Sequence, residues 1–134
     1  MQVQSLIQTE IILYVRDQDL STEFYSIILS RQPSLHVPGM TEFILSDTCK
    51  LGLMPNDGIA KIIHPNLPHP ETATGIPRCE IYWLVDDINA ACALALTAKA
   101  KLVSPAALRD WGHRVVYFSD PDGHVIAFAE VVKQ

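Results

Sequence analysis

Two segments of this chain, EIILYVRD starting at Glu10 and EIYWLVDD starting at Glu80, share the pattern E-I-x-x-x-V-x-D. Each segment is an apolar run that ends in acidic residues. Such a run is typical of a buried strand that leads into the acidic first turn of a helix. Because the pattern recurs with the same order of residues, the sequence predicts a fold built from two similar modules.

A helical pattern follows each predicted strand. Asp17, Asp19 and Ser21 supply the cap and first-turn residues of the first helix, and Asp86 and Asp87 stand at the start of the second. The apolar residues of each segment have the i, i+4, i+7, i+8 spacing of one helix face. These residues are Leu20, Phe24, Ile27 and Ile28 in the first helix, and Ile88, Cys92, Ala95 and Leu96 in the second.

Three more strands are predicted in each module. A weak candidate lies around residues 33–37 and its counterpart around 101–105, and a pair of stronger apolar runs follows each. The paired runs are TEFILSD and CKLGLMP in the first module, and HRVVYFSD and HVIAFAE in the second. In the second pair, Asp120-Pro121-Asp122-Gly123 forms a tight turn, because proline presets φ at its second position and glycine suits its exit.

The chain therefore reads βαβββ twice, which predicts an α+β fold in one domain covering residues 1–134. We expect module one at about residues 8–55, a linker at 56–78, and module two at about 79–132. Joining the edges of the two modules would give a curved, cleft-bearing mixed sheet with its helices outside. The prolines of the linker predict irregular structure there, and its His64 and His69 are expected to be loop residues rather than metal ligands.

Composition excludes several classes of function. The net charge is −5, and without a basic cluster neither nucleic acid nor an anionic membrane is an expected partner. No apolar run approaches the ~18–20 residues of a membrane span, and the first ten residues do not resemble a signal peptide. The 3 cysteines fit neither a disulfide framework nor a zinc site, so a reducing, cytoplasmic location is expected.

The duplicated βαβββ pattern, with VDDINAA at the second helix and SDPDGHVIAFAE near the end, resembles the vicinal oxygen chelate superfamily. This superfamily contains glyoxalase I, extradiol dioxygenases, and fosfomycin- and bleomycin-resistance proteins. The resemblance covers nearly the whole chain, from about Thr9 to Val132. It is specific for the fold but not for the activity, because one fold carries many functions.

The resemblance also implies four positions for a divalent metal. Glu10 and Glu80 occupy the two on the first strand of each module, and both are plausible ligands. The two on the last strands are Gly52 and Ala127, whose side chains cannot bind a metal. Glu130 lies three residues beyond Ala127, so strand alternation points it to the opposite face. We therefore expect no cofactor, with a divalent metal held by Glu10 and Glu80 as the alternative.

Strand alternation predicts the residues that line the cleft. Glu10 and Glu80 are unexplained by packing, because acids are rarely buried without a partner. If they converge, one of them could act as a general base; the alternatives are contacts with a ligand, an Arg such as Arg114, a backbone group, or solvent at a strand start. The loop LRDWGHR places Arg109, Trp111 and Arg114 at or near the rim. The predicted ligand-binding residues are Glu10, Tyr14, Met54, Glu80, Tyr82, Trp111, His113 and Tyr117.

These features favour a small-molecule-binding protein of the glyoxalase/bleomycin-resistance type that lacks the family metal centre. The negative charge and the paired acids favour a cationic or polar aromatic ligand. The resemblance implies a homodimer. The competing hypothesis is a glyoxalase-like lyase or isomerase, which would use a metal or would use Glu10 and Glu80 as acid and base. A dioxygenase is disfavoured, because iron needs a His/His/Glu set that the four positions do not offer.

Overall fold

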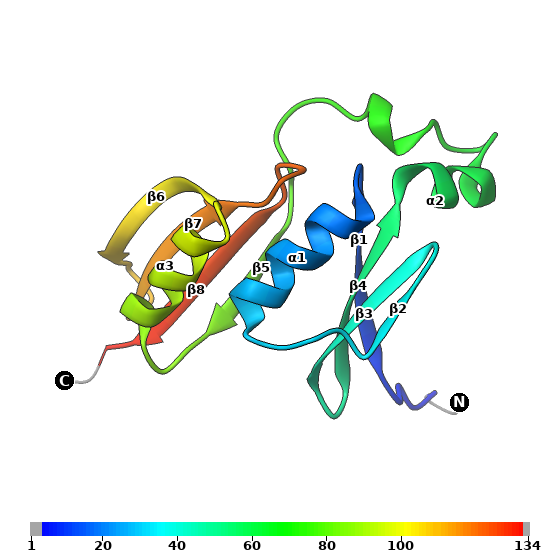
Figure 1. Cartoon of the computed structure of the whole chain (residues 1–134). Coiled ribbons are helices and arrows are strands. Elements are labelled where there is room, and N and C mark those ends of the chain that lie inside the picture. The colour runs from blue at the N-terminus through cyan, green and yellow to red at the C-terminus, as the bar shows by residue number, and fades with distance from the viewer. Residues whose placement is uncertain (1–3, 133–134) are drawn as a thin grey trace. The chain divides into compact units, whose positions relative to one another are not determined.

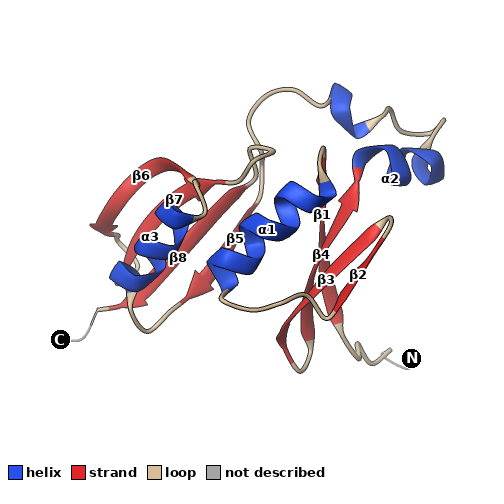
Figure 2. Cartoon of the chain, viewed as in Figure 1, coloured by secondary structure: helices blue, strands red, loops and turns tan. Residues whose placement is uncertain are grey.

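A computed structural model describes residues 4–132 and confirms the α+β fold with two βαβββ modules. Each module contains a four-stranded mixed sheet (Figures 1 and 2). The chain forms two compact units: residues 4–22 with 31–73, and residues 23–30 with 74–132. Within the described residues, no helix combines the length and apolarity needed to cross a membrane.

The sheet of the first unit has the strand order β1-β4-β3-β2. Its strands are β1 (Thr9–Val15), β2 (Leu35–Val37), β3 (Met40–Ser46) and β4 (Cys49–Pro55). β1 runs parallel to β4, and the other pairs are antiparallel. Phe43, Leu51 and Leu53 are fully buried in this unit, and alternate residues of the same strands form the opposite, more accessible face.

The second sheet repeats the first strand for strand, in the order β5-β8-β7-β6. Its strands are β5 (Glu80–Leu84), β6 (Lys101–Leu108), β7 (His113–Ser119) and β8 (Val125–Val131). β5 runs parallel to β8, while β6, β7 and β8 are antiparallel neighbours. The helix α3 (Ile88–Thr97) packs against β7 and β8 and covers one face (Figure 1).

The helices begin where the sequence predicts, but the faces that they bury are rotated slightly from the predicted faces. Asp17 Oδ1 accepts from the Leu20 backbone N–H in α1 (Gln18–Leu29), and Asp87 caps α3. Leu20 and Leu96, predicted on the apolar faces, are 47% and 66% exposed. The small residues at neighbouring positions pack inward in their place. The buried helical residues are Ser21, Phe24, Tyr25 and Ile28 in α1, and Ile88, Ala91 and Ala95 in α3.

The prediction of an irregular linker was wrong for its first part. Residues Asn56–Ile63 form the helix α2, and Pro70–Thr72 form a short 3₁₀ turn, η1. The linker prolines lie at positions 65, 68, 70 and 77, so none interrupts the hydrogen bonds of α2. Pro55 stands at the N-cap position, where a missing N–H is tolerated.

The predicted turn between β7 and β8 forms around Asp120. The Gly123 N–H donates to the Asp120 carbonyl at 3.0 Å, and Gly123 has a positive φ of 90°. Asp120 Oδ1 also accepts from the backbone N–H groups of Asp122 and His124, both at 2.9 Å. The Asp120 side chain therefore organises the turn that the sequence predicts from its proline and glycine.

Candidate functional site

The face of the second sheet that lies opposite α3 carries most of the predicted ligand-binding residues. The strand register places Tyr82 beside Ala127 and Ala127 beside Tyr117. Both tyrosines are half-buried and pack against a cluster of Val115, Ala127 and Ala129, each fully buried. Small alanine side chains let two aromatic rings lie over the sheet, so this face offers a flat apolar floor with two phenol groups.

A chain of hydrogen bonds joins three aromatic residues at this face. Trp111 Nε1 donates to Tyr82 Oη at 2.8 Å, and Tyr82 Oη lies 2.7 Å from His113 Nδ1. The Tyr82 and His113 rings lie 5.9 Å apart, and Trp111 is 56% exposed. The loop between β6 and β7 thus brings Trp111 to a tyrosine of β5.

Arg109, from the same loop, lies over the ring of Tyr117 with its guanidinium carbon 5.2 Å from the ring centroid. Its Nη2 donates to Ser104 Oγ and to the carbonyls of Pro105 and Val115, at 3.1–3.2 Å. Its Nε is buried and has no acceptor among the described residues. Three neutral acceptors therefore hold a cationic group against an aromatic ring.

The phenol of Tyr117 lies in a mixed electrostatic environment. Burial raises the pKa of Tyr117 above its ordinary value, and the nearby carboxylate of Glu80 raises it further, while Arg109 opposes both effects. Glu80 itself is exposed at the start of β5. Five predicted ligand-binding residues of the second module thus lie on one face: Glu80, Tyr82, Trp111, His113 and Tyr117.

The three remaining predicted residues lie on the matching face of the first sheet. Tyr14 and Met54 are register partners, and Ile12 pairs with Gly52. Glu10 leans across the sheet toward Gly52, where a Cβ would overlap Glu10 Oε2. Glycine at position 52 therefore leaves room for the carboxyl group of Glu10.

Two further charged residues surround Glu10. Burial raises the pKa of Glu10 above its ordinary value, a hydrogen bond and the negative charge of Glu42 raise it further, and Lys50 opposes them. Glu42 Oε1 lies 3.5 Å from Lys50 Nζ, and Glu10 Oε2 is buried without a hydrogen-bond partner. Glu10 therefore lies beside an ion pair, in an environment that raises the pKa of its carboxyl group.

Glu42 and Lys50 were not among the residues predicted to lie near Glu10. A signal existed, because Glu42 lies between Thr41 and Phe43, which are both fully buried, and so must lie on the other face of β3. Strand alternation alone does not predict which strands are neighbours. That information comes from the order β1-β4-β3.

The prediction that Arg114 lies at the rim of the cleft, as a possible partner of Glu10 or Glu80, was wrong. Its register partner is Glu130, and the two lie on the face of the sheet that carries α3. Glu130 does point away from the candidate site, as predicted. Its Oε2 accepts from the Ile88 backbone N–H at 2.8 Å and so caps α3.

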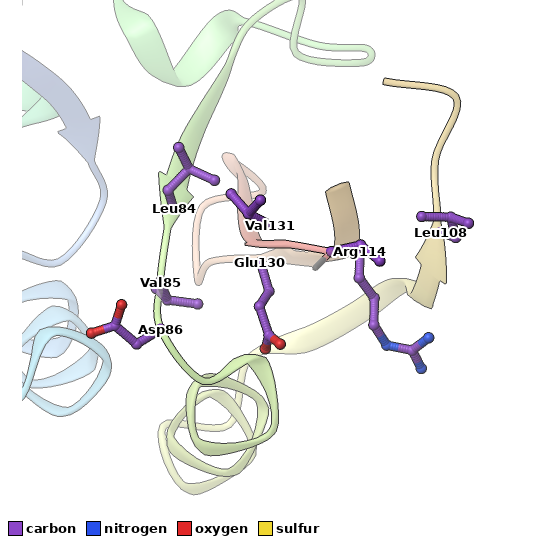
Figure 3. Close-up of a pocket in the computed structure, with 8 residues that line it drawn as sticks. Leu84, Val85, Asp86, Leu108, Arg114, Glu130 and Val131 are labelled. Carbon is purple, nitrogen blue, oxygen red and sulfur yellow. The ribbon is translucent and has the colours of Figure 1, made fainter. Parts of the chain in front are cut away.

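A cavity of about 890 Å³ lies at the end of the second sheet, beside Arg114 and Glu130 (Figure 3). Figure 3 shows the apolar side chains of Leu84, Leu108 and Val131 around these two charged groups. None of the predicted ligand-binding residues lines this cavity. It adjoins the His113 end of the aromatic face, because Val131 of its lining is the register partner of His113.

Among residues 4–132, two other clusters of polar side chains offer metal-type ligand atoms, and both are occupied by internal hydrogen bonds. His69 lies 2.8 Å from Asp57 through Nε2 and accepts from the Glu71 N–H through Nδ1. Asp120 organises the turn that contains the other two residues of its cluster, Asp122 and His124. The prediction that His69 is a loop residue agrees with its position before η1.

The four positions implied by the family resemblance do not fit a metal centre. Gly52 and Ala127 lack donor atoms, and Ala127 is fully buried beneath Tyr82 and Tyr117. Glu10 lies beside the ammonium group of Lys50, whose positive charge would repel a metal cation at this position. Only Glu10 and Glu80 offer oxygen ligands at these positions, and two carboxylates make a poor selective site for a transition metal.

Comparison with known proteins decides the family. A family model described as a glyoxalase-like domain matches residues 8–133. The chain belongs to this glyoxalase-like family. The match spans both modules and confirms the resemblance stated from the sequence. A comparison with curated proteins finds no sequence match.

Solved structures share the glyoxalase-like fold at low sequence identity. A glyoxalase/bleomycin resistance protein/dioxygenase family enzyme from Burkholderia phytofirmans PsJN has a TM-score of 0.78 at 15% identity, with 92% of this chain and 97% of that chain covered. A glyoxalase-related enzyme from Fulvimarina pelagi has a TM-score of 0.75 at 18% identity, covering 90% and 85%. A protein of unknown function from Agrobacterium tumefaciens str. C58 has a TM-score of 0.73 at 22% identity, covering 98% of each chain. At these identities the likeness concerns the fold alone.

Proposed function

We propose that this glyoxalase-like protein binds a small molecule without the family metal centre. The observation that carries the proposal is the aromatic face of the second sheet, where Tyr82 and Tyr117 lie over a floor of buried alanines beside Trp111 and His113. Small-molecule sites are lined mostly by apolar and aromatic side chains with a few fixed polar groups, and this face supplies both kinds of group. Ala127 supports a site without a metal, because it forms part of this floor at a position where the family resemblance implies a metal ligand.

Metal analysis and a ligand screen test this proposal together. Protein purified without chelator should contain no stoichiometric metal, and titration with nickel, zinc and manganese should reveal no tight site. A screen by thermal shift should then identify compounds that raise the melting temperature, because a ligand of the native state stabilises it by mass action. Tyr82→Ala should abolish the shift, while Leu96→Ala, on the exposed side of α3, should keep it. A metal bound through Glu10 and Glu80 would contradict the proposal.

Glu10 supports a second candidate, a lyase or isomerase that uses acid–base chemistry. Its raised pKa and the unpartnered Oε2 are properties of a carboxyl group that could serve as a general acid or base. The test is exchange of the α-proton of carbonyl compounds in D₂O, followed by proton NMR. Catalysed exchange that Glu10→Gln abolishes would favour the enzyme. Exchange at the background rate for wild-type protein would count against it.

Homodimerisation and a cytoplasmic location belong to the same proposal. Multi-angle light scattering on the purified protein tests the first, with a mass twice that of the 14.9 kDa chain as the expected result. The predicted contributions of Glu10, Tyr14 and Met54 are tested by the same ligand screen. Their substitution should weaken binding if the first sheet also contacts the ligand.

A further inference from the structure

Two hydrogen bonds hold the Trp111–Tyr82–His113 chain together, and their direction decides the tautomer of His113. The Trp111 indole N–H can only donate, so Tyr82 Oη accepts from it. The structure offers Tyr82 Oη no other described acceptor than His113 Nδ1, at 2.7 Å. With Oη accepting from the indole, donation of the single Tyr82 proton to Nδ1 gives a neutral His113 ring that carries its own proton on Nε2.

This tautomer makes His113 a hydrogen-bond donor toward its surroundings. Nε2–H has no acceptor among the described residues, and the His113 side chain is half-buried rather than fully solvated. Trp111 and Tyr82 thus hold the ring by one nitrogen and leave the other for a partner. A polar group held in this way costs little entropy when it binds a ligand.

Arg109 adds a second donor group to the same face. No described carboxylate lies within 4.0 Å of its guanidinium, whose Nη2 binds only neutral acceptors. Its Nε remains buried without an acceptor. A guanidinium held against Tyr117 and unpaired with an acid favours an oxygen anion.

The one acid on this face, Glu80, lies toward the other end of the site. Glu80 pairs with Val125 at the start of β8, whereas His113 pairs with Val131 at its end. The apolar floor formed by Ala127 and Ala129 separates these two levels. His113 therefore lies at the end far from the carboxylate, and Arg109 lies between them, over Tyr117.

We propose that the ligand of this face is a planar, aromatic-type molecule carrying a carboxylate or enolate oxygen, which Arg109 and His113 bind while Tyr82 and Tyr117 contact its ring. This inference rests on the proposed small-molecule function and names the ligand class. The proposed anionic ligand differs from the cationic ligand that the net charge of the chain suggests. The groups at the site are hydrogen-bond donors, although the net charge of the chain is negative.

Two probes with the same naphthalene ring and opposite charge test the ligand class. NMR titration of the whole protein with 2-naphthoate should shift the Trp111 indole and His113 ring signals, and 2-naphthylmethylammonium should bind at least about tenfold more weakly. Arg109→Gln should weaken naphthoate binding by about tenfold, whereas Lys101→Gln, an exposed charge at the start of β6, should not. The histidine ¹⁵N shifts should report the Nε2–H tautomer in the wild type and lose it in Tyr82→Phe.

The outcomes separate the two proposals. If the ammonium probe shifts these signals as strongly as naphthoate, the face binds small molecules but the proposed ligand class is wrong. If neither probe shifts them, both the ligand class and the aromatic face as the binding site are wrong. A His113 ring protonated on Nδ1 would overturn the hydrogen-bond chain, whatever the probes do.

Discussion

The phenol of Tyr25 donates a 2.6 Å hydrogen bond to Asp120 Oδ2, across 95 residues of sequence. Tyr25 belongs to α1 of the first module, yet this part of α1 lies in the compact unit of the second module. Both groups are buried, and Asp120 uses its other oxygen to hold the β7–β8 turn. One carboxylate therefore joins the helix to the turn.

Removing this phenol should destabilise the protein. Tyr25→Phe leaves a buried carboxylate oxygen without its donor, and we expect a loss of about 1–3 kcal/mol in the free energy of unfolding. Urea denaturation followed by circular dichroism measures the change. Asp120→Asn should be destabilising too, while Asp47→Asn, at the exposed matching turn of module one, should change stability by less than about 0.5 kcal/mol. Additive effects of Tyr25→Phe and Asp120→Asn would contradict the link, because contacting residues should couple.

Tyr25 should also make the protein sensitive to alkaline pH. Burial and the charge of Asp120 raise the pKa of Tyr25 well above its ordinary value of 10.0. The folded state therefore holds the phenol proton more tightly than the unfolded state, so this contribution is complete below pH 10.0 and is lost as pH rises toward the folded pKa. Thermal unfolding from pH 8 to 11 should show a steeper decline for the wild type than for Tyr25→Phe. Equal slopes would argue against a buried, neutral phenol.

Glu10 predicts a pH dependence in the acid and neutral range. Its folded-state pKa is raised from the ordinary value of 4.5, first by burial and then by Glu42. Its contribution to stability is thus largest below pH 4.5 and declines as pH rises through the folded pKa. Glu10→Gln, which resembles the protonated side chain, should remove this decline and raise the melting temperature at pH 7.5. Glu80→Gln, at the exposed matching position, is the control and should leave the pH profile unchanged.

Glycine at position 52 should matter chiefly because of Glu10. Gly52→Ala places a Cβ against Glu10 Oε2, so we expect it to lower the melting temperature of the wild-type protein. In a Glu10→Ala background the obstructing atom is absent, and the same substitution should have a much smaller effect. Differential scanning fluorimetry of the four variants measures this coupling. The same decrease in both backgrounds would mean that Gly52 serves another purpose.

Glu130 should stabilise α3 rather than take part in ligand binding. Glu130→Ala removes the acceptor of the Ile88 N–H, and a lost helix cap costs about 0.5–2 kcal/mol. Chemical denaturation measures this loss, and Asp86→Ala, at an exposed residue just before the helix, is the control. Binding of the naphthoate probe should be unchanged in folded Glu130→Ala. Weaker binding there would place Glu130 nearer the ligand than we propose.

The sequence by itself determined the two modules, the strands, most helix boundaries and the face of each strand. The repeat at Glu10 and Glu80 and the two-residue strand period carry that information locally. They also predicted that Tyr82 and Tyr117 face the cleft and that Glu130 points away from it. Only the tertiary structure decided which side chains meet. Glu10 lies near Glu42 and Lys50 because β4 lies beside β1 and β3 lies beside β4. Arg109 lies over Tyr117 because a loop folds back over the sheet. Such contacts depend on strand order and loop path, which no local periodicity encodes. The physical reason is that a period fixes the direction of a side chain but not its neighbour.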